Sequence, residues 1–160
     1  MSRQVLTTQA SPALDAWARL LRGHSALTRL LSAELRAEHG LTINDYEALL
    51  VLSREPECAM RRVDLAGGLL LTASGVTRLL DGLERSGWVT KATCDSDARV
   101  TYAVLTEEGR AKLDEASRSH LAAIQALFEE RYNEEELLLL AQLLERLPSA
   151  SGAHGDDCGA

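Results

Sequence analysis

Hydrophobic side chains along this chain recur mostly three or four positions apart, which is the spacing of a helix with one buried face. This spacing predicts helices over residues 12–38, 42–54, 61–69, 73–85, 107–132 and 134–147. Two further segments, 88–92 and 100–105, are rich in β-branched and aromatic residues and flank a polar stretch typical of a turn. The chain is therefore predicted to be mainly α-helical, with one small β-hairpin.

Residues that favour helix ends stand at the boundaries of these segments. The candidates at the beginnings are Ser11, Thr42, Thr72, Thr106 and Asn133, and the candidates at the ends are Gly40, Gly87 and Pro148. Residues 149–160 are rich in Ser, Gly and Ala with acidic residues. We expect one domain over residues 11–148, with a flexible leader over 1–10 and a disordered tail over 149–160.

The composition indicates what the core of this domain is made of. A chain of 160 residues with 46% hydrophobic residues is long enough to bury the core of one ordinary domain. Only 4% of the residues are aromatic, so Leu, Val and Ala must build most of it. In the short helix predicted over 61–69, we expect Val63, Leu65 and Ala66 to point inward.

The formal net charge of −7 would by itself discourage a nucleic-acid partner. The excess acid, however, lies near the end of the chain. Residues 111–160 carry ten acidic and four basic side chains, whereas residues 54–110 carry nine acidic and eight basic ones. The middle of the chain is almost neutral, and its charge does not exclude DNA binding.

Signals for targeting, metals and redox chemistry are weak. No apolar stretch has the length of a signal peptide or a membrane span, so the cytoplasm is the expected location. Cys58, Cys94 and Cys158 form no CxxC pair, and no cofactor is expected. A modifiable thiol at Cys94, or a metal held by His24 and His120, stays open as an alternative that would make the protein thiol- or metal-responsive.

The helix predicted over 73–85 carries the main functional signal. One face would hold Ser74, Thr77, Arg78, Asp81 and Arg85, and the opposite face would hold Val76, Leu79, Leu80 and Leu83. Short hydroxyl side chains permit close approach to DNA, and a guanidinium can donate two hydrogen bonds to guanine or to a phosphate. Gly75 in the first turn is tolerable where closeness to a partner matters. The ordinary alternative is an amphipathic helix whose polar face is only solvated.

The order of the predicted elements favours the DNA-binding interpretation. A short helix, a turn, an amphipathic helix and a hairpin follow one another, which is the order of a winged helix-turn-helix. Over about residues 41–113 the sequence resembles the MarR family of bacterial transcription regulators. The matching motifs are Leu41-Thr42 with Tyr46 and Leu49, Leu65-Ala66, Ser74-Gly75-Val76-Thr77-Arg78-Leu79-Leu80-Asp81-Gly82-Leu83-Glu84, Gly87-Trp88-Val89, Asp97-Ala98-Arg99 and Leu105-Thr106-Glu107-Glu108-Gly109. The combination is specific, although no single motif is.

The resemblance implies a homodimer with two winged lobes on a shared helical base, which binds a near-palindromic operator in double-stranded DNA. It places the DNA-binding lobe at about 42–106 and the dimerisation helices at about 12–38, 107–132 and 134–147. Members of this family are most often repressors that a small-molecule effector releases from DNA. The same is therefore expected of this chain.

The resemblance also implies roles for single residues. Ser74, Thr77 and Arg78 would enter the major groove. Arg99 would reach the minor groove from the tip of the hairpin, called the wing, and Asp97 would help to hold it. Ala98 departs from the family pattern, which often has a second basic residue at this position.

Further basic residues could hold the DNA backbone. Arg61 and Arg62 begin the supporting helix, at a position that crosses the backbone in helix-turn-helix proteins. One of them is predicted to hold a phosphate, and Lys91 on the first wing strand is a further candidate. The alternative is that these side chains are only solvated.

The last helix offers an independent argument for a dimer. It places Leu137, Leu138, Leu139, Leu140, Leu143, Leu144 and Leu147 on more than one side. A helix that is apolar over most of its circumference must be covered all round, which a partner chain could do. Trp17 and Arg22 on the first helix are candidates for an effector pocket, although Trp17 at the dimer base and Arg22 in solvent are the plainer alternatives.

Two other classes of function are an enzyme and a protein-interaction adaptor. An enzyme has little support, since the chain has no glycine-rich phosphate loop and no nucleophile elbow. A helical protein-interaction adaptor with a winged helix that does not bind DNA remains an alternative because the chain is acidic. Salt-dependent binding to a DNA duplex separates the adaptor from the regulator.

Overall fold

The computed structural model of the chain describes residues 11–69, 71–93 and 100–148. Its elements are α1 (Pro12–His39), α2 (Ile43–Arg54), the 3-10 turn η1 (Pro56–Cys58), β1 (Ala59–Arg61), α3 (Arg62–Gly68), α4 (Ala73–Arg85), β2 (Val89–Thr93), β3 (Thr101–Leu105), α5 (Glu107–Glu129) and α6 (Glu134–Glu145). The predicted mainly α-helical fold with a small β-structure is confirmed. The predicted leader and tail lie outside the described residues.

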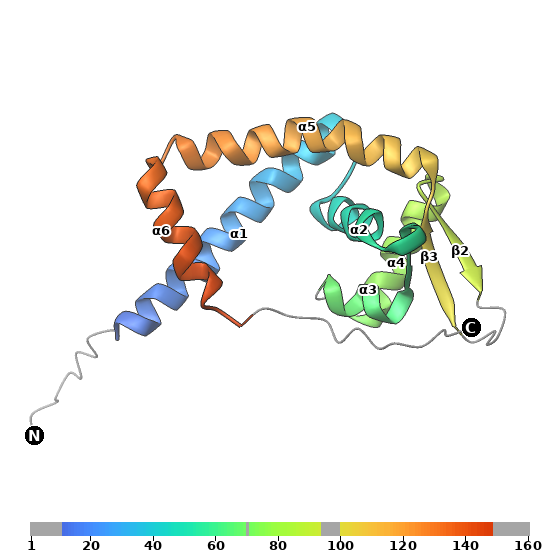
Figure 1. The fold of residues 1–160 in the computed structure, drawn as a ribbon, viewed down its shortest axis with the longest axis horizontal. Coiled ribbons are helices and arrows are strands. Elements are labelled where there is room, and N and C mark those ends of the chain that lie inside the picture. Colours follow the sequence, from blue (N-terminus) through green and yellow to red (C-terminus); the bar gives the residue numbers. More distant parts are fainter. Residues whose placement is uncertain (1–10, 70, 94–99, 149–160) are drawn as a thin grey trace, which may run out of the picture.

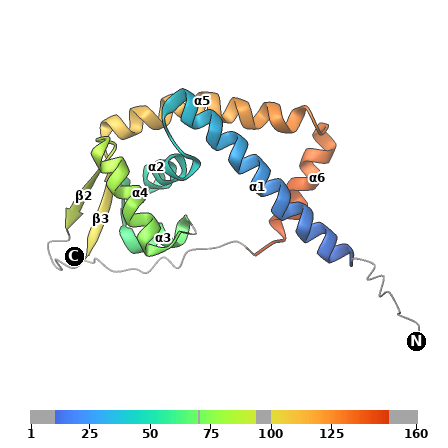
Figure 2. The ribbon, with the colours of Figure 1, turned by 180° about the vertical axis from the view of Figure 1, so that it is seen from behind.

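The molecule has two parts that α5 connects (Figures 1 and 2). At one end, α2, α3, α4 and the strands form a lobe, and at the other end α6 turns back from α5. The long helix α1 packs against α5, and α5 also packs against α2. We call the first part, residues 41–106, the lobe, and the part made of α1, α5 and α6 the base.

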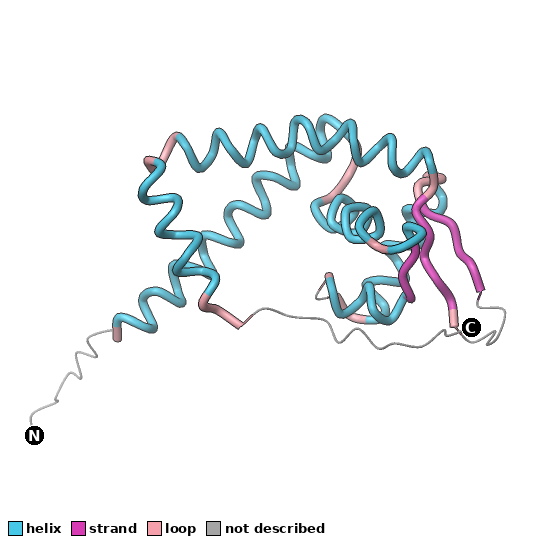
Figure 3. The backbone as a smooth tube through the Cα atoms, viewed as in Figure 1, coloured by secondary structure: helices cyan, strands magenta, loops and turns pink. Residues whose placement is uncertain are grey.

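The three strands form one small antiparallel sheet in the order β1-β3-β2 (Figure 3). The predicted hairpin is confirmed, because β2 pairs with β3 in a register that places Lys91 opposite Ala103. Strand β1 was not predicted. It occupies Ala59–Arg61, so Arg61 ends a strand and precedes α3 instead of lying inside a helix over 61–69.

The predicted caps explain why most helices begin where they do. The Thr42 side chain accepts a hydrogen bond from the backbone of Asp45, whose carboxylate accepts one from the backbone of Thr42. Asn133 and Glu136 repeat this reciprocal capping at α6. Ser11 stands before α1 but makes no side-chain cap. Such caps satisfy backbone donors that a helix beginning leaves without partners.

Two helix ends also have clear local causes. Helix α1 ends at Gly40, which adopts the left-handed conformation (φ 70°) that glycine tolerates best. Helix α5 ends at Glu129, three residues before the predicted end at Tyr132. The chain leaves the helix early because Asn133 must be extended in order to cap α6.

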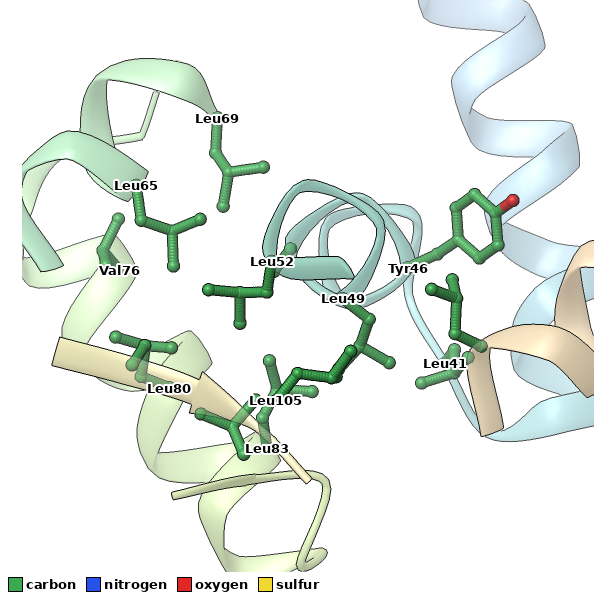
Figure 4. Packing of buried hydrophobic residues seen from close by; sticks show 14 of the residues in the cluster. Leu41, Tyr46, Leu49, Leu52, Leu65, Leu69, Val76, Leu80, Leu83 and Leu105 are labelled. Carbon is green, nitrogen blue, oxygen red and sulfur yellow. The ribbon is translucent and has the colours of Figure 1, made fainter. Parts of the chain in front are cut away.

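The core lies mainly in the lobe, where α1 and α5 add Leu35, Leu113 and Ala116, and it is built mainly from leucine, as the composition predicts (Figure 4). Its fully buried large side chains are Leu35, Leu41, Leu49, Leu52, Leu65, Leu80 and Leu83. In Figure 4, Leu52 of α2 points toward Leu65 of α3. The prediction that Val63 points inward is wrong, because this side chain is 73% exposed. Leu65 faces the core, and Val63, two residues earlier on a helix, lies on the opposite side.

The lobe meets α5 at an unusually close contact. Thr106 donates a hydrogen bond to the carbonyl of Gly87 (2.6 Å) and also caps α5 by accepting from the backbone of Gly109 (3.0 Å). A Cβ atom at position 109 would overlap the carbonyl oxygen of Trp88 and lie 2.9 Å from Leu105 Cδ1. Only glycine lets the first turn of α5 lie so near the loop before β2. This contact fixes the direction in which α5 leaves the sheet.

A second junction joins the last residue of α1 and the first turn of α2 to the middle of α5. The His39 ring, whose side chain is 9% exposed, lies 2.7 Å from the hydroxyl of Ser119, measured from Nε2. The hydroxyl groups of Tyr46 and Ser117 lie 3.1 Å apart, and the ring of His120 packs edge-on against Tyr46. The contacts of Tyr46 tie the lobe to the base, whereas the contact between His39 and Ser119 joins two helices of the base.

Candidate nucleic-acid interface

Helix α4 separates an apolar face from a polar one, as predicted. Val76, Leu80 and Leu83 are buried in the lobe core. Ser74, Thr77, Arg78 and Arg85 are exposed, and Asp81 is half-buried. The sharp separation means that the core fixes α4 while its hydroxyl groups and arginines face solvent. This polar face has the size and chemistry to enter a DNA major groove.

The beginning of α4 has very little side-chain bulk. The Thr72 hydroxyl caps the helix by accepting from the backbone N–H of Gly75 (3.1 Å), and it lies 3.2 Å from the hydroxyl of Ser74. A Cβ atom at position 75 would lie 3.2 Å from the same Thr72 oxygen. Gly75 therefore keeps the cap uncrowded as well as leaving room for a partner. From the sequence, only the second role was predicted for this glycine.

The two arginines before and at the start of α3 have different surroundings. Arg62 donates a hydrogen bond from Nη2 to the hydroxyl of Thr77 on α4 (3.2 Å). Arg61 donates from Nε to the carboxylate of Asp64 (2.6 Å). The Arg62 guanidinium thus lies beside the polar face of α4, whereas the charge of Arg61 is balanced by a neighbour. Asp64, three residues after Arg61, was the signal in the sequence that could have shown which of the two arginines is paired.

Arg78 is the exposed arginine in the middle of the polar face. Among the residues that the structure describes, no hydrogen bond or ion pair joins its guanidinium to another side chain. An arginine held by a well-packed helix, with its donors directed to solvent, can grip a guanine edge or a phosphate. Arg78 has the geometry that the sequence predicted for it.

Lys91 joins β2 to α4. Its ammonium Nζ lies 2.7 Å from Glu84 Oε2 and 3.4 Å from Asp81 Oδ1. The hydrogen bond to Glu84, supported by Asp81, raises the pKa of Lys91 above its ordinary value, so the side chain stays charged. The sequence predicted Lys91 on the wing but not its contact with Glu84, because that contact depends on how β2 packs against α4.

The two predicted residues of the wing tip, Asp97 and Arg99, lie outside the described residues, as does Cys94. The strands that lead to them are described up to the pair Thr93 and Thr101. These strands extend from the sheet beside α4 (Figure 1).

The predicted effector residues lie on the surface of the base. Trp17 is 58% exposed on α1, and Arg22 is exposed one and a half turns further along. A small cavity of about 90 Å³ lies between α1 and α5 and is lined by Glu34, Leu35, Glu38, Ser119, His120 and Ala123. The structure does not bring Trp17 or Arg22 to this cavity.

Within residues 11–69, 71–93 and 100–148, no three His, Cys, Asp or Glu side chains are grouped so that they could hold a metal ion. In the same part of the chain, no helix is long and apolar enough to span a membrane. The half-buried Cys58 accepts a hydrogen bond from Arg110 (2.6 Å).

Taken together, α3, α4 and the paired strands define a winged helix-turn-helix lobe. The second helix presents its polar face, the first helix supports it and adds an arginine, and the hairpin stands alongside (Figure 2). This is the class of protein that the fold and the surface define.

Known proteins agree with this class. The sequence model of the MarR family matches residues 39–100. The HTH-type transcriptional repressor YetL of Bacillus subtilis is 32% identical over 114 residues, which are 69% of this chain and 68% of that protein. The solved structure of AbsC, a MarR family transcriptional regulator from Streptomyces coelicolor, is 31% identical with a TM-score of 0.74, and the match covers 84% of this chain and 91% of AbsC.

A third similar protein was solved with DNA. It is Sco3205, a MarR family transcriptional regulator from Streptomyces coelicolor, which is 26% identical with a TM-score of 0.74 over 81% of both chains. The chain described here belongs to the MarR family of transcriptional regulators.

Proposed function

We propose that this protein is a cytoplasmic regulator that binds a near-palindromic operator in double-stranded DNA as a homodimer and represses transcription. The observation that carries the proposal is the exposed polar face of α4, which holds Ser74, Thr77 and Arg78 on a helix fixed by buried leucines. Its similarity to Sco3205, which was solved with DNA, supports the same function. The proposal includes no catalytic step.

The proposed DNA contacts fall into three groups. Ser74 and Gly75 let the beginning of α4 approach the base edges closely, while Thr77 and Arg78 read them. Arg62 contacts a phosphate beside the groove, and Arg61 contributes a weaker contact because it is paired with Asp64. From the family resemblance alone, Arg99 is assigned to the minor groove and Asp97 to holding the wing.

The exposed leucines of the base support the proposed homodimer. The large apolar side chains left uncovered on α1, α5 and α6 are Leu14, Trp17, Leu20, Leu21, Leu30, Leu121, Leu138, Leu139, Leu143 and Leu144. An apolar surface of this extent is unfavourable in water and marks a protein interface. A two-fold dimer through these helices would place its two α4 helices about 34 Å apart, one turn of DNA.

The proposed effector is a small molecule that binds the base or its junction with the lobe. The contacts of Tyr46 with Ser117 and His120 of α5 make this junction a place where a bound molecule could change the position of the lobe. Trp17 and Arg22 on α1 remain the proposed contacts for an aromatic or anionic effector. Candidate ligands should be tested for weakening of operator binding.

DNA binding can be tested without knowing the operator. Duplexes selected from a random pool, and duplexes from upstream of the protein's own gene, are titrated with the purified protein at several salt concentrations. We expect a steep loss of affinity as salt rises, since each phosphate contact adds about 0.9 to the slope of log K against log salt. A protein-interaction adaptor would show no selected sequence and no salt-dependent binding to duplexes, and that result would contradict the proposal.

The dimer can be tested with a matched pair of variants. Leu139→Glu places a charge on the exposed face of α6, whereas Val63→Glu places one on an exposed apolar residue of the lobe. We expect sedimentation analysis to show that Leu139→Glu dissociates the dimer and that Val63→Glu does not. A wild-type protein that stays monomeric at micromolar concentration would exclude the proposed assembly.

A further inference from the structure

We propose that Lys91 supports DNA recognition through Asp81 and Glu84 rather than by holding a phosphate. In this role it is a positioning residue, which cancels negative charge on the DNA side of α4 and holds the wing strand β2 against that helix. The inference rests on the proposed function, because it concerns how the polar face of α4 meets DNA.

The register of the sheet sets the direction of the Lys91 side chain. Lys91 lies opposite Ala103, and side chains of directly opposite residues in an antiparallel pair point to the same face. Ala103 is buried in the lobe core, so Lys91 points to the side of the sheet that faces α4. The side chain therefore reaches the helix rather than the open side of the wing.

The end of the Lys91 side chain contacts two carboxylates of α4. The Lys91 ammonium lies 2.7 Å from one oxygen of Glu84 and 3.4 Å from one oxygen of Asp81. Since an ammonium group has three N–H donors, two of them are directed to α4. A phosphate that bound Lys91 would have to compete with two carboxylates for the same charge.

The position of these carboxylates explains why they need a partner. Asp81 follows Thr77 by four residues and Arg78 by three, so it shares their face of α4. Glu84 follows Asp81 by three residues and continues this face toward the end of the helix. Two unpaired carboxylates here would repel the phosphates of a bound duplex. With Lys91 in place, the summed charge of Asp81, Glu84 and Lys91 is −1, whereas the two carboxylates alone carry −2.

The test is a thermodynamic cycle on duplex binding, measured by fluorescence anisotropy with a selected operator. The variants are Lys91→Gln, the pair Asp81→Asn with Glu84→Gln, and all three substitutions together. We expect Lys91→Gln alone to weaken binding about three- to tenfold, because it breaks both ion pairs and so releases β2 from α4. In the chain that already carries the neutral pair, the same Lys91→Gln change should alter affinity less than about twofold.

A direct phosphate contact predicts the opposite pattern. Lys91→Gln would then weaken binding by the same factor in both backgrounds, and in both it would lower the salt slope by about 0.9. That result would overturn the inference.

Two controls separate this inference from the proposed function and from misfolding. Arg78→Ala, measured in parallel, must weaken operator binding if α4 reads DNA, whatever Lys91 does. If Arg78→Ala has no effect, the proposed function fails; if it weakens binding but the cycle shows no coupling, only the inference about Lys91 fails. Lys91→Arg preserves the charge and should bind like the wild type, and thermal unfolding of each variant checks that the fold is intact.

Discussion

The lobe and the base use the same residue, leucine, in opposite ways. In the lobe, Leu49 and Leu65 are fully buried within one chain. In the base, Leu138 and Leu139 are 60% and 55% exposed, and α6 has no buried residue. Hydrophobic content alone therefore does not show where a chain's own core lies. The core of the lobe is complete within one chain, with Leu35, Leu113 and Ala116 of the base contributing to it, whereas α6 and the exposed apolar residues of α1 and α5 leave a surface that a second copy would cover.

Replacing one leucine in each region should give the largest contrast. Leu49→Ala removes packed atoms from the lobe core and should lower the free energy of unfolding by about 2–5 kcal/mol. This loss should be the same at every protein concentration. Leu139→Ala should instead cost stability only through association, so its effect should shrink on dilution, as the wild type and the variant both become monomeric. Urea unfolding at two protein concentrations measures both.

The expected contrast fails if the losses of unfolding free energy caused by Leu49→Ala and Leu139→Ala change with protein concentration in the same way. Equal behaviour would mean that the leucines of α6 are not buried between copies of the chain.

The next largest effect is expected at the contact that joins lobe and base. Gly109→Ala forces a methyl group against the Trp88 carbonyl and Leu105, and should cost about 1–3 kcal/mol or more. Gly82→Ala is the matched control on α4, because no atom lies within 4 Å of the added Cβ. That substitution should be neutral or stabilise by about 0.5–1 kcal/mol. Thermal unfolding of both variants compares them, and equal stability would contradict the close contact.

A smaller effect should distinguish the two arginines near the start of α3. Arg62→Ala removes the guanidinium that lies beside Thr77 and should lower the salt slope of duplex binding by about 0.9. Arg61→Ala should change the slope less, because Asp64 already balances its charge. Titrations from 50 to 200 mM salt (a range of about fourfold) measure both slopes. A larger change for Arg61→Ala would reverse the assignment.

The smallest effect concerns the junction of α1, α2 and α5. Burial lowers the pKa of His120 below its ordinary value of about 6.5, against an opposing influence from Glu34. The unfolded chain then binds the proton more tightly, so the contribution of His120 to stability is present above about pH 6.5 and is lost as the pH falls toward its lower value in the folded protein. Measuring the free energy of unfolding across this pH range should show that His120→Asn flattens the pH dependence, and an unchanged dependence would contradict the role of His120.

The sequence predicted the helices well because their ends are decided locally. Thr42, Thr72 and Asn133 cap the helices that they were expected to cap. Strand β1 was missed because three residues carry no period of their own, and their extended form depends on pairing with β3. Val63 was misplaced because a helix of seven residues gives too few apolar positions to fix which side faces the core.

The candidate site was predictable to the extent that it lies on one helix. Ser74, Thr77 and Arg78 share a face by spacing alone, and the structure leaves that face exposed. The contacts of Lys91 with Glu84, and of Arg62 with Thr77, depend on how separate elements pack. No pattern along the sequence encodes those distances.

The central claim is that the exposed face of α4 reads DNA sequence. The most direct measurement is the ratio of the dissociation constants for a scrambled duplex and the selected operator, at one salt concentration, for the wild type and Arg78→Ala. The account predicts that Arg78→Ala loses about 1–3 kcal/mol of operator binding and that most of this loss appears in the ratio, since non-specific binding depends on phosphate contacts. An unchanged ratio, with operator affinity equal to that of the wild type, would contradict it.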